Sequence, residues 1–154
     1  MMKDNPTMRL KGTIGEAAAD GLLAGEAAGV IMAAYLALAG LTWGSGPVEV
    51  LALFDPGETA SALFGLIAHL AVSGVYGTVF GLGWRLAARW LSRIPVWLAG
   101  TVCGLILFAP ALAILLPAAS SPLLTIPPAH FALAHGLYGL TLGIGLARRY
   151  TPDR

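Results

Sequence analysis

Four long apolar segments, separated by short polar or proline-rich stretches, dominate the pattern of hydrophobic and polar positions along the chain. They span residues 20–43, 58–84, 95–116 and 128–147. Each is close to the length of about 20 residues that an α-helix needs to cross the hydrocarbon core of a bilayer. The pattern therefore predicts an all-α membrane protein, with four transmembrane helices in a single transmembrane domain over residues 1–154.

Local signals indicate where these helices begin and bend. Asp55-Pro56-Gly57-Glu58 combines an N-cap residue, a proline at the first helical position and an acid at the third, and so predicts the start of the second helix. Pro127-Pro128 predicts the start of the fourth helix. Pro110 lies inside the third segment, where it predicts a kink that frees the carbonyl of Ile106.

The second and fourth segments carry the same motif. Gly-Val-Tyr-Gly-Thr-Val-Phe-Gly-Leu-Gly at 74–83 returns 62 positions later as Gly-Leu-Tyr-Gly-Leu-Thr-Leu-Gly-Ile-Gly at 136–145. The first and third segments share Ala-Gly-x-x-x-Gly, at 24–29 and 99–104, with an offset of 75. Because each unit contains two crossings, both copies have the same orientation. We expect two parallel-repeat helix hairpins, with repeat units of about 20–84 and 95–147.

The basic residues fall in three places only. The connections 44–57 and 117–127 contain no Lys or Arg. The nine basic residues of the chain are Lys3, Arg9, Lys11, Arg85, Arg89, Arg93, Arg148, Arg149 and Arg154. Since Lys and Arg stay on the cytoplasmic side of membrane proteins, the N-terminus, the C-terminus and the middle connection are predicted to be cytoplasmic.

Composition supports a membrane protein and excludes several other classes. The chain is 57% hydrophobic and 11% charged, with a mean hydropathy of +0.78. No charged residue occurs from 94 to 147, a run of 54 residues that must cross twice. We expect a multi-pass protein of a bacterial inner (plasma) membrane with membrane lipids around it. The net charge of +1 argues against nucleic acid as a partner, and Cys103 is the single cysteine, which excludes a disulfide framework.

Glycines recur four residues apart in every predicted helix. They are Gly21, Gly25, Gly29, Gly77, Gly81, Gly100, Gly104, Gly139 and Gly143. Small residues at this spacing let helix backbones approach closely in lipid. We interpret these faces as helix-packing seams, within the bundle or against a partner, that also include the equivalent residues Tyr76 and Tyr138. The alternative is that they leave room for a flat ligand.

Glu26 is the only acid well inside a predicted span. A lone carboxylate in lipid is costly, so this intramembrane charge should face protein or water. We expect it to pair with Arg85 or Arg148. Proton transfer and contact with another subunit are the alternatives.

His69 and His135 lie at depths that differ by only about 4–5 Å when measured along their helices. Two such histidines could ligate a haem b axially or contact a quinone head group. The repeat pairs His135 with Ser73 and His69 with Phe131, so the two histidines are not equivalent positions. We therefore expect an interhelical hydrogen bond and no cofactor, with haem b or quinone at these residues as the alternatives.

Sequence signatures of catalysis are absent. The chain has no P-loop, dinucleotide fingerprint, HExxH or G-x-S-x-G motif, and nothing with metal-ligand spacing. We expect neither an enzyme acting alone nor a soluble small-molecule substrate, although a place within an enzyme complex stays open.

Ala-His-x-x-Tyr-Gly-x-x-x-Gly, at 134–143, resembles a pattern found in small uncharacterised bacterial four-helix integral membrane proteins. In general type, the chain is also similar to accessory subunits of bacterial respiratory or photosynthetic electron-transfer complexes. The leading hypothesis is therefore a non-catalytic structural accessory subunit that packs against larger integral membrane subunits, such as those of a quinol-oxidising complex. The alternatives are a haem- or quinone-binding redox protein using His69 and His135, and a small transporter or proton carrier centred on Glu26.

Overall fold

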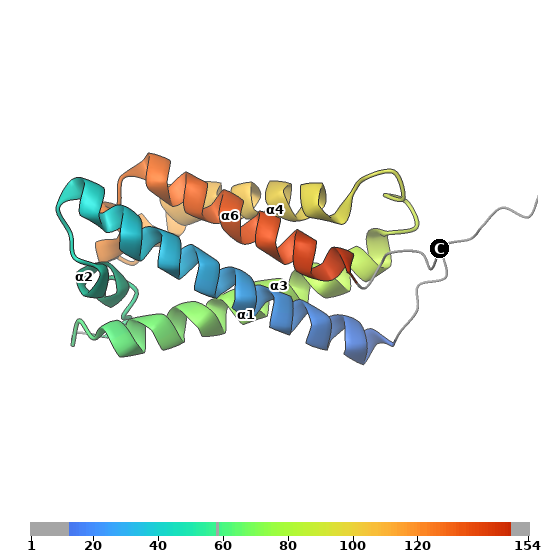
Figure 1. Ribbon diagram of the computed structural model, residues 1–154, viewed down its shortest axis with the longest axis horizontal. Helices are drawn as coiled ribbons and strands as arrows, with labels where there is room; N and C mark the ends of the chain where they lie inside the picture. Colours follow the sequence, from blue (N-terminus) through green and yellow to red (C-terminus); the bar gives the residue numbers. More distant parts are fainter. Residues whose placement is uncertain (1–12, 58, 149–154) are drawn as a thin grey trace, which may run out of the picture.

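The computed structural model describes residues 13–57 and 59–148, which form helices and connections without a β-strand (Figure 1). The long helices are α1 (Ile14–Ala39), α3 (Ala62–Ala87), α4 (Val96–Pro110) and α6 (Pro128–Ala147). The short elements are η1 (Gly40–Trp43), α2 (Pro47–Ala52), η2 (Ala111–Leu115), α5 (Leu116–Ala118) and η3 (Pro122–Thr125).

Four helical segments are long and apolar enough to cross a membrane. They are Ile14–Trp43, Ala62–Ala87, Val96–Ala118 and Pro128–Ala147. The predicted all-α class with four candidate membrane spans is confirmed at this level. Of the predicted cytoplasmic basic residues, Lys3, Arg9, Lys11, Arg149 and Arg154 lie outside the described residues, as does Glu58.

α1 begins six residues before the predicted span, because a capping box starts it ahead of the apolar run. The Thr13 side chain accepts a hydrogen bond from the Glu16 backbone N–H, and the Glu16 carboxylate accepts one from the Thr13 N–H. This reciprocal pair satisfies two helix-terminal donors. Hydropathy indicates where the chain enters lipid, whereas the cap determines where the helix begins.

The predicted start of α3 at the Asp55 motif is wrong. The helix begins at Ala62, and Ser61 is its N-cap. The Asp55 carboxylate instead accepts hydrogen bonds from the Thr59 hydroxyl at 2.7 Å and from the backbone N–H groups of Ser61 and Gly57 at 2.8 and 2.9 Å. These bonds, that of Thr59 first, hold the pKa of Asp55 below its ordinary value. The carboxylate is thus used to close a loop rather than to cap a helix.

Pro110 changes the helical winding instead of ending the third span. α4 runs through Pro110 into the π-helical turn η2, where the Leu116 N–H donates to the Ala111 carbonyl five residues earlier. Proline has no N–H to donate, and a wider turn accommodates its ring. The apolar segment therefore continues to Ala118, two residues past the predicted end.

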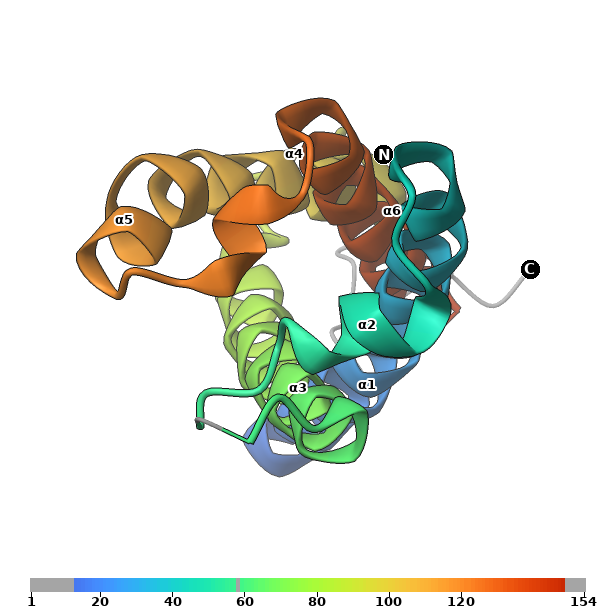
Figure 2. The same ribbon diagram turned by 90° about the vertical axis from the view of Figure 1, so that its left-hand side faces the viewer.

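The long helices lie in the order α3, α1, α6, α4. α1 packs along α3, α4 packs along α6, and α1 and α6 pack against each other at the centre. Figure 2 views the helices end-on, with α2 in front. α3 and α4 do not pack along one another. We call the end that holds α2 and η3 the α2 end, and the end that holds residues 13, 88–95 and 148 the terminal end.

Glycine contacts bring α1 and α3 together. A Cβ added at Gly25 would lie 2.5 Å from the Ser73 carbonyl oxygen and 2.8 Å from the Gly77 Cα, and one at Gly81 would lie 2.6 Å from the Ala17 oxygen. Distances this short are not found for real side chains, so only glycine allows the helices to approach so closely.

α4 and α6 meet in the same way. A Cβ at Gly100 would lie 2.8 Å from the Gly143 Cα, and one at Gly104 would lie 3.0 Å from the Gly139 Cα. All nine glycines predicted as packing positions lie against a neighbouring helix of the same chain. These glycine faces are therefore occupied from within the described bundle.

The buried core follows the contact between α1 and α6. Leu36 of α1 and Leu142 and Leu146 of α6 are fully or almost fully buried, and Val50 and Ile126 close the core at the α2 end. The outward faces of α3 and α4 carry exposed apolar side chains. Such faces suit contact with lipid tails.

Candidate functional site

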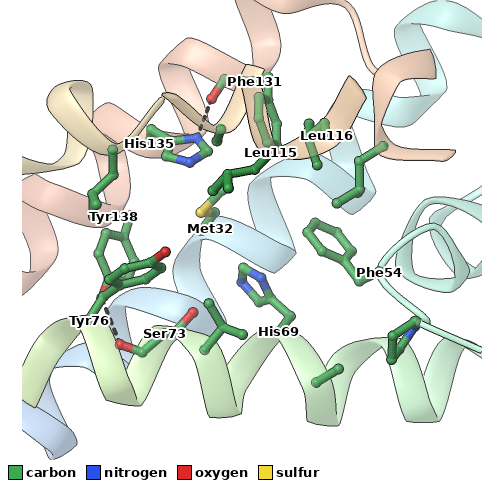
Figure 3. Close-up of a pocket in the computed structure, with 16 residues that line it drawn as sticks. Met32, Phe54, His69, Ser73, Tyr76, Leu115, Leu116, Phe131, His135 and Tyr138 are labelled. Carbon is green, nitrogen blue, oxygen red and sulfur yellow. Dashed lines mark hydrogen bonds between the residues drawn. The ribbon is translucent and has the colours of Figure 1, made fainter. Parts of the chain in front are cut away.

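An apolar cleft of about 370 Å³ lies between α3 and the α4–η2 segment (Figure 3). α1 and α6 contribute to its inner wall, and segments of the α2 end close it on one side. Its size is at the lower end of the range, about 300–1,000 Å³, typical of small-molecule sites. The lining residues are Met32, Phe54, Pro56, Ala68, His69, Val72, Ser73, Tyr76, Leu107, Ala111, Leu115, Leu116, Leu123, Phe131, His135 and Tyr138.

His69 of α3 and His135 of α6 both line this cleft. Each lies seven residues after the first residue of its helix, which corresponds to a depth of about 10 Å along the axis. The similar depth of the two histidines was expected from the sequence. That they share one cavity depends on the arrangement of four helices, which the sequence does not reveal.

Each histidine donates a hydrogen bond to a backbone carbonyl. His69 Nε2 lies 3.0 Å from the Gly29 oxygen of α1, and His135 Nδ1 lies 2.9 Å from the Phe131 oxygen in its own helix. A carbonyl oxygen only accepts, so the ring proton lies on Nε2 of His69 and on Nδ1 of His135. Of the two, only His69 makes the expected interhelical bond.

The second ring nitrogen of each histidine is a lone-pair acceptor. Among the described residues, every fully buried side-chain nitrogen or oxygen has a hydrogen-bond partner. Nδ1 of His69 and Nε2 of His135 have none there, so neither nitrogen is fully buried. Both histidines line the cleft, and a bound molecule can therefore reach these nitrogens.

Aromatic rings flank the two histidines. The Phe54 ring centroid lies 4.6 Å from that of His69, and the Phe131 centroid lies 4.5 Å from that of His135. In the view of Figure 3, the Met32 side chain lies between the two imidazoles. The cleft thus offers flat apolar walls with two acceptor nitrogens.

The tyrosines predicted as equivalent packing residues have different roles. Tyr138 is buried, and its hydroxyl donates to the Ser73 carbonyl of α3 at 2.7 Å. Tyr76 is 38% exposed at the open side of the cleft. Of these two tyrosines, only Tyr138 makes a hydrogen bond across the bundle within the described residues.

Glu26 lies beside the cleft rather than in its lining. A Cβ at Gly74 would lie 2.7 Å from the Glu26 Oε1 atom, so the carboxylate rests against the α3 backbone. Within residues 13–57 and 59–148, Glu26 forms no ion pair with Arg85 or Arg148, and the predicted pairing is absent there. The Glu26 carboxylate lies beside Gly74, and Arg85 follows 11 residues later in α3, about 16 Å along the helix axis.

His130 forms a separate cluster at the α2 end. Its Nδ1 lies 2.9 Å from the Tyr35 hydroxyl, its Nε2 lies 3.4 Å from the Thr42 hydroxyl, and its ring packs on Trp43. These contacts join α6 to α1 and η1. His130 thus provides a histidine of the same helix that does not line the cleft.

Sequence reasoning missed Met32 and Phe54 as cleft residues. Phe54 directly follows α2 and its C-cap Leu53, and nothing local in the sequence indicates that its ring packs on His69. Met32 belongs to an all-apolar stretch in which no periodicity distinguishes a cleft-facing position. No cluster of three or more His, Cys, Asp or Glu that could hold a metal ion occurs in the described part of the chain.

Comparison with known proteins gives no match to a protein-family model, a curated protein or a solved structure. The resemblance to small bacterial four-helix membrane proteins and to accessory subunits therefore stays a prediction.

Proposed function

We propose that this protein binds a lipid-soluble molecule with a small aromatic head group, of the quinone class, in the cleft between α3 and α4. The observation that carries the proposal is that His69 and His135, from two different helices, present lone-pair nitrogens to one apolar cavity. An apolar pocket with a few convergent polar groups is the usual form of a small-molecule site.

Entry from the bilayer is supported by the open side of the cleft. Val72 and Tyr76 of α3 and Leu115 of η2 line the cavity and are 54%, 38% and 54% exposed. Because α3 and α4 do not pack along each other, a membrane-dissolved molecule can move in sideways without passing through water. The leucines of the α4–α5 segment would then contact its hydrocarbon tail.

A quinone fits the cleft better than a haem. A haem iron held by both histidines would need their free nitrogens to face each other across one metal atom. Met32 also lines the cleft, and its side chain lies between the two imidazoles in the view of Figure 3. A single aromatic ring needs to reach only one nitrogen, with Phe54 or Phe131 against its face.

The membrane orientation is part of the same proposal. The described arginines Arg85, Arg89, Arg93 and Arg148 lie at the terminal end, whereas the α2 end has no Lys or Arg between residues 44 and 57 or 117 and 127. By the positive-inside rule, the terminal end is cytoplasmic and the α2 end faces outward. A bacterial plasma membrane is the proposed location.

We further propose that the hairpins α1–α3 and α4–α6 are copies of one unit. Gly139 lies against Gly100 as Gly77 lies against Gly21, which relates α3 to α6 by 62 residues and α1 to α4 by 79. The offset of 75 inferred from the Ala-Gly-x-x-x-Gly motif is about one helical turn shorter. The glycine contacts therefore favour aligning α4 with α1 at an offset of 79 residues rather than 75.

A second function, that of an accessory subunit, is favoured by the exposure of α4. The only buried residues of this helix are Gly100 and Gly104, and its outward face, with Val102, Leu105 and Ile106 exposed, is open to lipid or to a larger membrane subunit. The glycine faces do not supply a surface for such a subunit, because they are occupied by the chain's own helices. Copurification in fixed stoichiometry with larger subunits after mild extraction tests it, and a partner-free preparation contradicts it.

The transporter hypothesis finds less support, because Glu26 is not among the cleft-lining residues. It predicts flux in liposomes that Glu26→Gln abolishes, and unchanged flux in the variant would contradict it.

Calorimetric titration of the full chain in detergent with a decyl-substituted benzoquinone and with its reduced hydroquinone tests the proposed function. Saturable binding of at least one of them is expected. It should weaken roughly tenfold in His135→Phe, the size of one lost hydrogen bond. His130→Phe, in the same helix but outside the cleft, should bind as the wild type does. Failure of both probes to bind contradicts the proposal.

A further inference from the structure

The polar groups of the cleft differ in whether they can donate or only accept a hydrogen bond. The ring protons of His69 and His135 are both used by backbone carbonyls, so the nitrogens that face the cleft only accept. The Tyr138 hydroxyl proton is likewise used by the Ser73 carbonyl. The two imidazoles and the Tyr138 hydroxyl therefore offer only acceptors to a bound molecule.

Two hydroxyl groups of the cleft can donate as well as accept a hydrogen bond. The Ser73 hydroxyl lines the cleft on the α1 side, where a Cβ at Gly29 would lie 2.6 Å from its Oγ. The Tyr76 hydroxyl lies at the exposed side of the cleft. Neither histidine can supply a donor unless it is protonated, which would place a charge among apolar walls at considerable cost.

From this pattern we infer that the cleft selects the reduced, dihydroxy form of an aromatic head group, a quinol, over the oxidised dione. The inference rests on the proposed function and names the form of the ligand. A quinol O–H donates to the lone pair of His69 Nδ1 or His135 Nε2. A quinone carbonyl at either nitrogen brings an acceptor to an acceptor and leaves both unpaired in an apolar site, which is costly.

Aromatic surroundings favour a ring diol over the hydroxyl of an aliphatic lipid. Phe54 packs near His69 and Phe131 near His135, so a flat ring can stack on a phenyl group while its hydroxyl reaches the imidazole. A sterol or diacylglycerol hydroxyl would form the hydrogen bond without the stacking.

Selection of the reduced form also has an electrochemical consequence. Oxidation of a quinol to a quinone releases two electrons and two protons, and tighter binding of the quinol raises the midpoint potential of the bound couple. Each tenfold preference corresponds to about 30 mV for a two-electron couple. The inference concerns binding alone and involves no electron transfer by the protein.

The test compares three probes on the full-length protein in detergent: n-decyl-hydroquinone, its bis-methyl ether and the matching n-decyl-benzoquinone. The ether keeps the ring and the tail but has no donor. We expect the hydroquinone to bind at least tenfold more tightly than either of the others. His69→Phe and His135→Phe should each reduce this preference, whereas His130→Phe should keep it.

The wild-type comparison does not depend on the folding of any variant. Equal affinity for all three probes, or tighter binding of the ether or the benzoquinone, overturns the inference and leaves the proposed function standing. Failure of every probe to bind overturns both. Decanol, which has the tail and a hydroxyl but no ring, is a further control, and its tighter binding than that of the hydroquinone overturns the assignment of an aromatic head group.

Discussion

The Tyr138 hydroxyl of α6 donates a hydrogen bond of 2.7 Å to the Ser73 carbonyl of α3, which joins two helices that do not pack along each other. The bond crosses the inner wall of the cleft, with both residues in its lining. It thereby helps to hold His135 and His69 on opposite sides of one cavity.

Tyr138→Phe is expected to destabilise the bundle by about 1 kcal/mol, a value typical of hydrogen bonds between membrane helices. The measurement is the free energy of unfolding in mixed detergent. Tyr76→Phe is the matched control, since Tyr76 has the equivalent motif position and no hydrogen bond within the described residues. Equal losses in the two variants would contradict a specific role for the Tyr138 bond.

Gly77→Ala and Gly139→Ala are expected to destabilise the protein strongly, by about 2 kcal/mol or more, because each added methyl group meets the backbone of the facing helix. Gly83→Ala is the control, since a Cβ there meets nothing within 4 Å. It should stabilise α3 by up to about 1 kcal/mol through helix propensity.

Thermal unfolding of the three variants in detergent measures these effects. A loss for Gly83→Ala as large as that for Gly77→Ala would show that close packing at the seam is not the cause.

The loop before α3 should weaken as the pH falls. Hydrogen bonds from Thr59, Ser61 and Gly57 lower the pKa of Asp55 in the folded chain below the ordinary value of 3.8. The stabilisation is therefore present above that value and is lost as the pH falls through the lower, folded pKa. Hydrogen exchange of the Ser61 and Gly57 amides should therefore increase as the pH falls below 3.8, beyond the intrinsic pH dependence.

Asp55→Asn removes the titrating group and should abolish this extra pH dependence, with fast exchange throughout. The same acid-induced increase in the variant would assign the effect to another group.

The proposed orientation is tested with two engineered cysteines in a Cys103→Ala background. Ser92→Cys lies in the connection at the terminal end, and Ser120→Cys lies at the α2 end; both positions are exposed. A membrane-impermeant maleimide added to intact cells should label Ser120→Cys, and should label Ser92→Cys only after permeabilisation. The reverse pattern would invert the topology.

Hydropathy and charge were sufficient to predict the four candidate spans, and glycine spacing was sufficient to predict close helix packing. Each of these patterns can be read within a single helix. The start of α3 was missed because the Asp55 side chain is used by its own loop rather than by the helix. The kink expected at Pro110 stays a prediction, and the π-helical turn that follows this residue is not indicated by composition.

The cleft could not be predicted from the sequence. In a soluble helix, polar residues mark the outer face, but here the outer faces of α3 and α4 are as apolar as the buried ones. His69 and His135 stood out because they are polar, and their shared cavity depends on which helices pack and which stay apart. Met32 and Phe54 had no such distinguishing feature.

Photoaffinity labelling with an azido-quinol in membranes, followed by peptide mass spectrometry, tests the central claim most directly. We predict saturable labelling of α3 around His69 and of α6 around His135, competed by n-decyl-hydroquinone and reduced in His135→Phe. Labelling spread over the outward faces of α3 and α4, without competition, would contradict a binding site in the cleft.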